Sequence, residues 1–167
     1  MYVNVFLSRS LFRYVMAMNT HDLSFAKLKL IDEDLSLVIV KNGKVVFETK
    51  KQGVSGFLEA IEKLNQDFVG ASVADKIVGV AAAMLCVYSG VSSVFALTIS
   101  EGGIRVLENN NIVCLFEKNV SNILNRTKND VCPFEKLAMD SGSSKETYVK
   151  LKTFASQMIG KSTKTNC

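Results

Sequence analysis

Gly70–Phe116 reads GASVADKIVGVAAAMLCVYSGVSSVFALTISEGGIRVLENNNIVCLF, and this stretch decides the fold. Apolar runs alternate in it with short polar and glycine-containing junctions, which predicts helix, strand, helix and strand in that order. The first helix is expected to begin at a Ser72 cap and to end at Gly90. Because this segment is small and apolar on nearly every side, we expect the helix to be buried.

The second half of the stretch predicts a central strand, a helix and another strand. Val94–Ile99 is continuously apolar, as is typical of a strand covered on both faces. Ser100 can cap a helix that runs to about Asn109. Ile112–Phe116 is then expected to form a second buried strand.

Elements on either side extend this α/β pattern. Upstream, Asp22–Ile31 has apolar residues at helical spacing, and Leu35–Val40 and Val45–Phe47 are short apolar runs. Asn42-Gly43 between the two runs indicates a hairpin, because both residues accept the positive φ of a type I′ turn. Further helices are expected after a Gly53–Gly56 turn, as a short turn over 121–124, from Cys132-Pro133 to Met139, and from Ser144 to Met158.

Together these elements predict a three-layer α/β/α fold with a mixed sheet of about four to five strands. The length of 167 residues fits one domain with a sizeable core. We assign that domain to residues 21–158, an N-terminal extension to 1–20 and a flexible tail to 159–167. The extension contains Met16 and Met18, and either could be the true initiator, which would make the first residues a mis-assigned start.

The composition excludes several classes of protein. Apolar residues make up 48% of the chain, which argues against disorder. The net charge of +4 is modest and no aromatics interleave with the basic residues, so we expect a solvated surface and no nucleic-acid partner. No apolar run reaches the ~18 residues that a membrane span needs. Free thiols in a reducing, cytoplasmic compartment are expected, because no C-x-x-C pair occurs among Cys86, Cys114, Cys132 and Cys167.

The strings SVADKIVG, TISEGG, NRT and CPFEK resemble a small prokaryotic family of uncharacterised proteins with the cytidine-deaminase-like fold. The resemblance covers about residues 22–154 and implies that fold. Zinc deaminases hold their metal with H-x-E on the buried helix and P-C-x-x-C at the start of the next. Val73-Ala74-Asp75 and Ser100-Glu101-Gly102-Gly103 stand at those places here, so we expect no metal site, no cofactor and no zinc-dependent deamination.

The residues at these two places form the candidate site. Asp75 would take the place of the deaminase glutamate as a catalytic group in the first turn of the buried helix, with Lys76 as an anion contact or ion-pair partner. The alternative is that the helix dipole alone favours the acid. Glu101 follows a central strand on the ligand side of the sheet, and Gly102 and Gly103 leave N–H groups open to a phosphate or carboxylate. A simple tight connection is the alternative for these three.

Three further residues complete the candidate site. Ser100 is expected to bind ligand beside Glu101. Arg126, in a polar loop, could grip an anion with two hydrogen bonds or form a surface ion pair. Cys132 stands at a helix start, where a thiol becomes a better nucleophile. However, Glu135 at the third helical position fits a capping box and opposes a thiolate, so a structural cysteine is the alternative.

Three functions follow from this site. The first is binding of a small anionic or nucleotide-like ligand without zinc. The second is a metal-independent enzyme that uses Cys132 or Asp75. The third is a non-catalytic dimeric regulatory module, for which a homodimer would be the partner.

Overall fold

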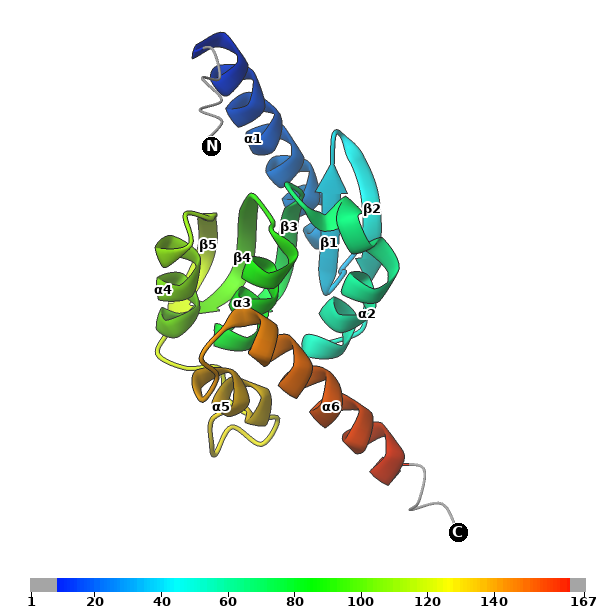
Figure 1. Cartoon of the computed structure of the whole chain (residues 1–167). Helices are drawn as coiled ribbons and strands as arrows, with labels where there is room; N and C mark the ends of the chain where they lie inside the picture. Colours follow the sequence, from blue (N-terminus) through cyan, green and yellow to red (C-terminus); the bar gives the residue numbers. More distant parts are fainter. Residues whose placement is uncertain (1–8, 163–167) are drawn as a thin grey trace, which may run out of the picture.

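A five-stranded mixed sheet forms the centre of the protein (Figure 1). The computed structural model describes residues 9–162, with side chains from Thr20 to Met158. The strand order is β2-β1-β3-β4-β5; β1 is antiparallel to both neighbours, whereas β3, β4 and β5 run parallel. The strands are β1 (Leu37–Lys41), β2 (Lys44–Thr49), β3 (Ser72–Val78), β4 (Ser93–Ser100) and β5 (Val113–Val120).

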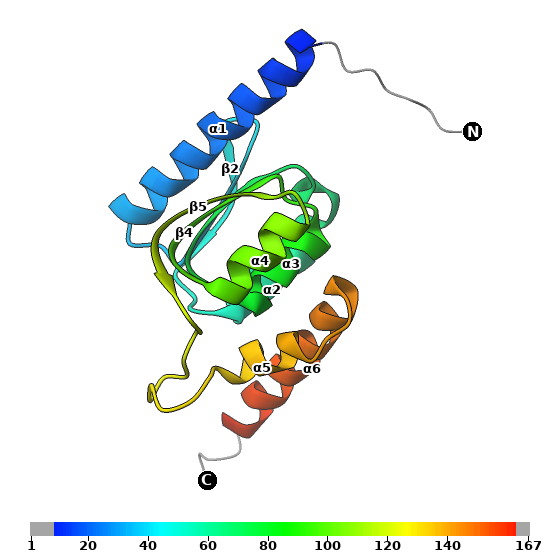
Figure 2. The same ribbon diagram turned by 90° about the vertical axis from the view of Figure 1, so that its left-hand side faces the viewer.

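Helices cover both faces of this sheet (Figure 2). One long helix, α1, lies on one face, whereas α2, α3 and α4 lie on the other, with α5 and α6 packed outside α3. The predicted three-layer α/β/α class is therefore confirmed. The helices are α1 (Arg9–Asp32), α2 (Val54–Leu64), the 3-10 turn η1 (Asn65–Phe68), α3 (Val80–Ser89), α4 (Glu101–Asn109), α5 (Pro133–Met139) and α6 (Ser144–Ser162).

Each face of the sheet has its own apolar core. The larger core lies under α3, where the side chains of Ala81, Ala82 and Ala83 are buried. Because these side chains are small, α3 can contact the sheet on one side and α5 and α6 on the other. The smaller core joins Leu23, Ala26 and Leu30 of α1 to the opposite face, next to Phe95 of β4.

The prediction that a helix begins at Ser72 is wrong. Ser72–Val78 is strand β3, and helix α3 begins at Val80 after Gly79. A short apolar run fits a buried strand and a buried helix equally well. Here the β-branched residues of the run pair with β1 on one side and β4 on the other, and only the alanine-rich part forms the helix. The predicted end at Gly90 is confirmed, since this residue is the left-handed C-cap of α3.

Of the other local predictions, one is confirmed and two are wrong in part or in full. The Asn42-Gly43 turn is confirmed, with φ of 52° and 73°. The strand expected over Ile112–Phe116 exists, but it is an edge strand whose side chains are mostly exposed, so the expectation of burial is wrong. The helical turn expected over 121–124 is also wrong, because Leu124 forms an isolated bridge with Val131. In residues 9–162, no helix combines the length and apolar character needed to cross a bilayer.

Candidate functional site

Two helices begin side by side where parallel strands end. β3 leads through Gly79 into α3, and β4 leads through Ser100 into α4. In open α/β sheets this edge is where ligands bind, because the helix N-termini present unpaired N–H groups. The Ser100 hydroxyl caps α4 by accepting a hydrogen bond from Gly103 N–H at 3.0 Å. Gly79 has no side chain with which to cap α3.

A carboxylate from a third helix fills this position. Glu135 of α5 accepts hydrogen bonds from Val80 N–H at 2.7 Å through Oε1 and from Ala81 N–H at 3.1 Å through Oε2. The Ser100 hydroxyl donates to Oε1 at 3.2 Å. Glu135 is only 2% exposed, so its charge is balanced inside the protein by these three donors and by the dipole of α3. We call this arrangement the Glu135 bridge.

The glycines of the two helix starts let the bridge form. A Cβ on Gly79 would lie 2.6 Å from the carboxyl carbon of Glu135, which is far inside van der Waals contact. A Cβ on Gly103 would lie 3.0 Å from the carbonyl oxygen of Val78. The two strand-to-helix turns therefore approach each other, and the carboxylate, more closely than any residue with a side chain would allow.

Sequence reasoning did not assign Glu135 or Gly79 to the site. Glu135 was expected to cap its own helix, but Cys132 forms no side-chain capping bond and the carboxylate instead reaches α3, 55 residues earlier. One signal was present in the sequence. Glu135 lies three residues before Ala138, which is buried, so the acid falls on the buried side of α5.

Asp75 lies away from the bridge, in the middle of β3. It pairs with Leu37 of β1 and Ala96 of β4, about 13 Å along the strand from Gly79 at the usual rise per residue. The earlier placement of Asp75 in a first helical turn is wrong, because β3 continues to Val78. Burial raises the pKa of the Asp75 carboxyl to about 7, against a hydrogen bond from Ile77 N–H that lowers it.

Asp75 has a thiol as a neighbour. Burial raises the pKa of Cys86 in α3 well above its usual range, and the charge of Asp75 raises it further. A thiol in such surroundings stays protonated and is a poor nucleophile. The Asp75 carboxyl, with a pKa of about 7, therefore lies next to the Cys86 thiol, whose pKa is raised well above its usual range.

Lys76 and Glu101 each lie next to an oppositely charged side chain at the protein surface. Lys76 was placed beside Asp75 in a helix, but it is in β3 and its ammonium group pairs with the Asp34 carboxylate. That ion pair lowers the pKa of Asp34. Glu101 is the first residue of α4, is exposed, and lies 3.8 Å from Arg105 one turn later. Neither side chain contacts the Glu135 bridge, and their ligand roles stay predictions.

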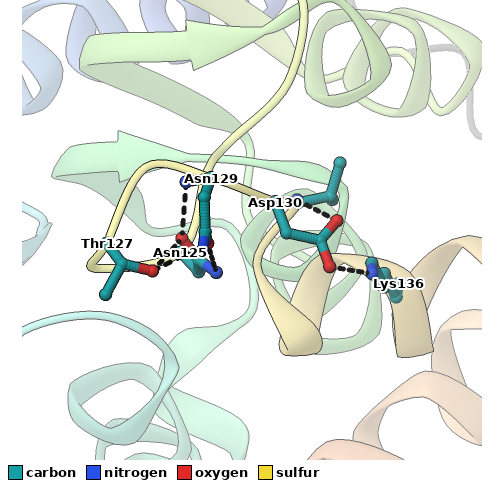
Figure 3. A network of polar contacts seen from close by, with 6 residues as sticks. Asn125, Thr127, Asn129, Asp130 and Lys136 are labelled. Atoms are coloured by element: carbon teal, nitrogen blue, oxygen red, sulfur yellow. Dashed lines mark hydrogen bonds and ion pairs between the residues drawn. The ribbon is translucent and has the colours of Figure 1, made fainter.

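Arg126 belongs to an exposed loop that is held together by its own side chains. Figure 3 shows Asn125, Thr127 and Asn129 pointing toward one another: Thr127 Oγ1 donates to Asn129 Oδ1 at 2.7 Å, and Asn125 Nδ2 donates to the same oxygen at 2.8 Å. Asp130 pairs with Lys136 of α5 at 2.6 Å. Arg126 itself is exposed, so its role as an anion contact stays a prediction.

Cys132 is half-buried at the N-cap of α5. Its backbone is held by hydrogen bonds to Ile123 and Lys136, and its thiol makes no capping bond. Among the described residues, no histidine, cysteine, aspartate and glutamate side chains gather in a group of three or more that could hold a metal ion. The structure thus brings Ser100, Gly102 and Gly103 together with Glu135, and leaves Asp75, Lys76, Arg126 and Cys132 outside that arrangement.

A family model, TM1506: Domain of unknown function (DUF1893), matches residues 25–155. The chain belongs to this family. No curated protein matches the sequence. Among solved structures, the chain is similar to a DUF1893 family protein (TM1506) from Thermotoga maritima, with 22% identity and a TM-score of 0.71. That match covers 92% of this chain and 95% of the other, which shows that DUF1893 proteins share this fold.

Two other solved structures match with lower TM-scores. Acinetobacter baumannii RibD is 17% identical with a TM-score of 0.43, over 63% of this chain and 35% of RibD. A diaminohydroxyphosphoribosylaminopyrimidine deaminase/5-amino-6-(5-phosphoribosylamino)uracil reductase from Thermotoga maritima is 16% identical with a TM-score of 0.42, over 74% and 40% of the two chains. TM-scores this low carry no inference about the fold family or the activity of this chain.

The helix starts do not fit the zinc of a deaminase. Their residues, Gly79, Val80, Gly102 and Gly103, supply no thiolate or imidazole, which are the ligands that zinc prefers in such sites. The Glu135 carboxylate already accepts hydrogen bonds from the first two N–H groups of α3, those of Val80 and Ala81. A Cβ on Gly102 would lie 2.6 Å from Val80 Cγ2, so a cysteine at this position would displace its neighbour.

A shallow depression of about 360 Å³ lies at the opposite end of α3. It is lined by Ser89 and Tyr88 of α3 and by residues from the end of α2 through η1, including Asn65 and Gln66. Ser89 is buried, and its hydroxyl has no hydrogen-bond partner. No residue predicted for the site lines this depression.

Proposed function

We propose that this DUF1893 protein is a non-catalytic module on a deaminase-like scaffold, and that it acts through contacts with other protein surfaces. One observation supports this above all: a structural carboxylate, Glu135, takes up the hydrogen-bond donors at the edge where the scaffold would hold substrate and metal. The anionic-ligand version of the function has less support, because an incoming anion would have to displace a buried carboxylate that already has three donors.

The test is a ligand and activity screen on the full chain. The wild-type protein, with and without added Zn²⁺, is incubated with cytidine, adenosine and their monophosphates, and ammonia release and melting temperature are measured. We expect no ammonia release and no thermal shift. Turnover, or a thermal shift with a monophosphate that disappears in Glu135→Gln, would overturn the proposal.

A chemical rescue experiment tests the role of the carboxylate directly. Glu135→Ala removes the internal anion, so added formate or acetate is expected to raise the melting temperature of this variant. Glu146→Ala is the matched control, because the Glu146 carboxylate also accepts a backbone N–H, from Gly142 at 3.0 Å, but at an exposed position. Equal responses of the two variants to formate would show that the α3 N-terminus is no anion site.

A second candidate is the binding of a small neutral molecule in the depression at the end of α3. The unpartnered Ser89 hydroxyl favours it, together with the side-chain amides of Asn65 and Gln66 on the same rim. No charged side chain lines this depression, so the ligand would be uncharged. A neutral nucleoside that stabilises the wild type but not Ser89→Ala would support this candidate, and equal shifts in both would remove it.

A further inference from the structure

One part of the sheet on the α1 side is open. Glu117 of β5 pairs with Lys27 of α1 at 3.1 Å, so Glu117 lies on the α1 side of the sheet. Because side chains alternate along a strand, Val113 and Leu115 lie on the same side. They are 47% and 54% exposed. Leu97 of β4 is only partly buried against the core of that side, so it extends the apolar strip.

Helix α1 packs on β1, β3 and β4, so the β5 part of this strip, Val113 and Leu115, stays exposed. The ammonium group of Lys27 lies over the ring of Phe95, with Nζ 4.4 Å from the ring centre, and marks the border of the covered region. Figures 1 and 2 show α1 crossing the sheet obliquely, with β5 outside its path. We call Leu97, Val113, Leu115 and Glu117 the open face.

The N-terminal half of α1 has no sheet beneath it. Between Arg9 and Asp22 the helix rises about 20 Å, and Figure 1 shows these turns extending past the end of the sheet. The sequence of residues 11–18, LFRYVMAM, is apolar apart from Arg13. Residues 9–19 contain two arginines and no acid, whereas the open face carries an acid, Glu117.

We propose that the N-terminal half of α1 docks on the open face of a second copy of this chain, and that the second copy returns the same contact. One molecule carries both surfaces, but they cannot meet within it, since α1 is one continuous helix whose other half is fixed on β1 and β3. A helix laid on a sheet is how this fold buries the rest of that side. A two-fold axis makes both contacts at once, and the arginines of one copy approach Glu117 of the other.

This inference rests on the proposed function, for which it names the partner. Different results would overturn the dimer and the proposed function. A monomeric wild-type protein would overturn the dimer but would not show catalytic activity. Deaminase activity would overturn the non-catalytic function but would not change the mass measured in solution.

The test measures the mass of the full chain by analytical ultracentrifugation from micromolar concentration upward. We expect a dimer for the wild type. Leu115→Glu in the open face and Phe12→Glu in the helix each place a charge in an apolar contact, and each is expected to raise the dimer Kd at least about tenfold. The matched control is Val149→Glu on α6, where the side chain is also 54% exposed, and it should stay dimeric. Circular dichroism and melting temperature check that all variants are folded.

Mixing the two variants gives a result that general destabilisation would not. In a homodimer of either variant, both helix-on-face contacts include a substituted residue. In a mixed dimer, the unchanged helix of the Leu115→Glu protein can dock on the unchanged open face of the Phe12→Glu protein, so one contact is intact. The mixture should therefore dimerise more strongly than either variant alone. A monomeric wild type, a Leu115→Glu protein as dimeric as the control, or a monomer that sediments with anionic lipid vesicles through its N-terminal helix would overturn the proposal.

Discussion

Replacing Glu135 measures how much the Glu135 bridge contributes to stability. Its carboxylate accepts hydrogen bonds from Val80 N–H, Ala81 N–H and the Ser100 hydroxyl, at 2.7, 3.1 and 3.2 Å. A hydrogen bond to a charged group contributes about 1.5–3 kcal/mol, and an anion at a helix N-terminus about 0.3–2 kcal/mol. Glutamine keeps the shape but turns an NH₂ group toward one donor, so one hydrogen bond and the dipole interaction are lost.

From these contributions we expect Glu135→Gln to lower the free energy of unfolding by about 2–4 kcal/mol, and Glu135→Ala by about 3–5 kcal/mol because the donors are then left buried without an acceptor. Urea unfolding followed by circular dichroism gives both values, with m unchanged if only stability is affected. Glu146→Gln is the control, and a much smaller change is expected there since Glu146 is exposed. If Glu135→Ala lay within about 0.5 kcal/mol of the wild type, the surface range for substitutions, the bridge would not be structural.

Three further changes test other parts of the structure. The pKa of Asp75 is about 7 in the folded chain, against an ordinary value of 3.8. Between these two pH values the folded form holds a proton that the unfolded chain releases. The free energy of unfolding should therefore fall as pH rises through this range, by up to about 1.4 kcal/mol per pH unit. Asp75→Asn should abolish that slope in urea unfolding, and equal slopes would contradict the burial of this carboxyl. Gly79→Ala should lower the free energy of unfolding by about 1–3 kcal/mol, because the new Cβ would collide with Glu135. Gly142→Ala is the control and should change stability little, since its Cβ would meet only a flexible side chain at 3.4 Å. Similar melting temperatures of the two variants would refute the close approach. Cys132→Ser should raise the free energy of unfolding by about 0.5–1 kcal/mol, because a serine oxygen can cap α5 where the thiol does not. A melting temperature below that of the wild type would argue that the thiol has its own role.

The order of elements was predictable because turn residues mark the junctions. Asn42-Gly43 indicated the hairpin and Gly90 the end of α3, and both lie where expected. The boundary between β3 and α3 was not predictable from hydrophobic spacing. Ser72–Ser89 is mostly apolar, with Asp75 and Lys76 as its charged residues, and only pairing with β1 and β4 makes its first part a strand.

The site was less predictable than the fold. Ser100 and Gly103 were singled out from their position after a strand, and they do lie at the helix start that the bridge joins. Glu135 was missed because its partners are 35 to 55 residues away in the chain, a distance at which residue spacing carries no information.

The length of chain between α3 and Glu135 also has a consequence for synthesis on the ribosome. The N–H groups of Val80 and Ala81 obtain their acceptor from a residue that is made 54 and 55 positions later. All five strands precede that residue, so the sheet can be complete in a nascent chain whose central helix start is still open to water. A chain truncated before α5 would keep every strand and lose the acceptor. Pulse proteolysis of stalled nascent chains should therefore show full protection only after residue 135 has left the exit tunnel.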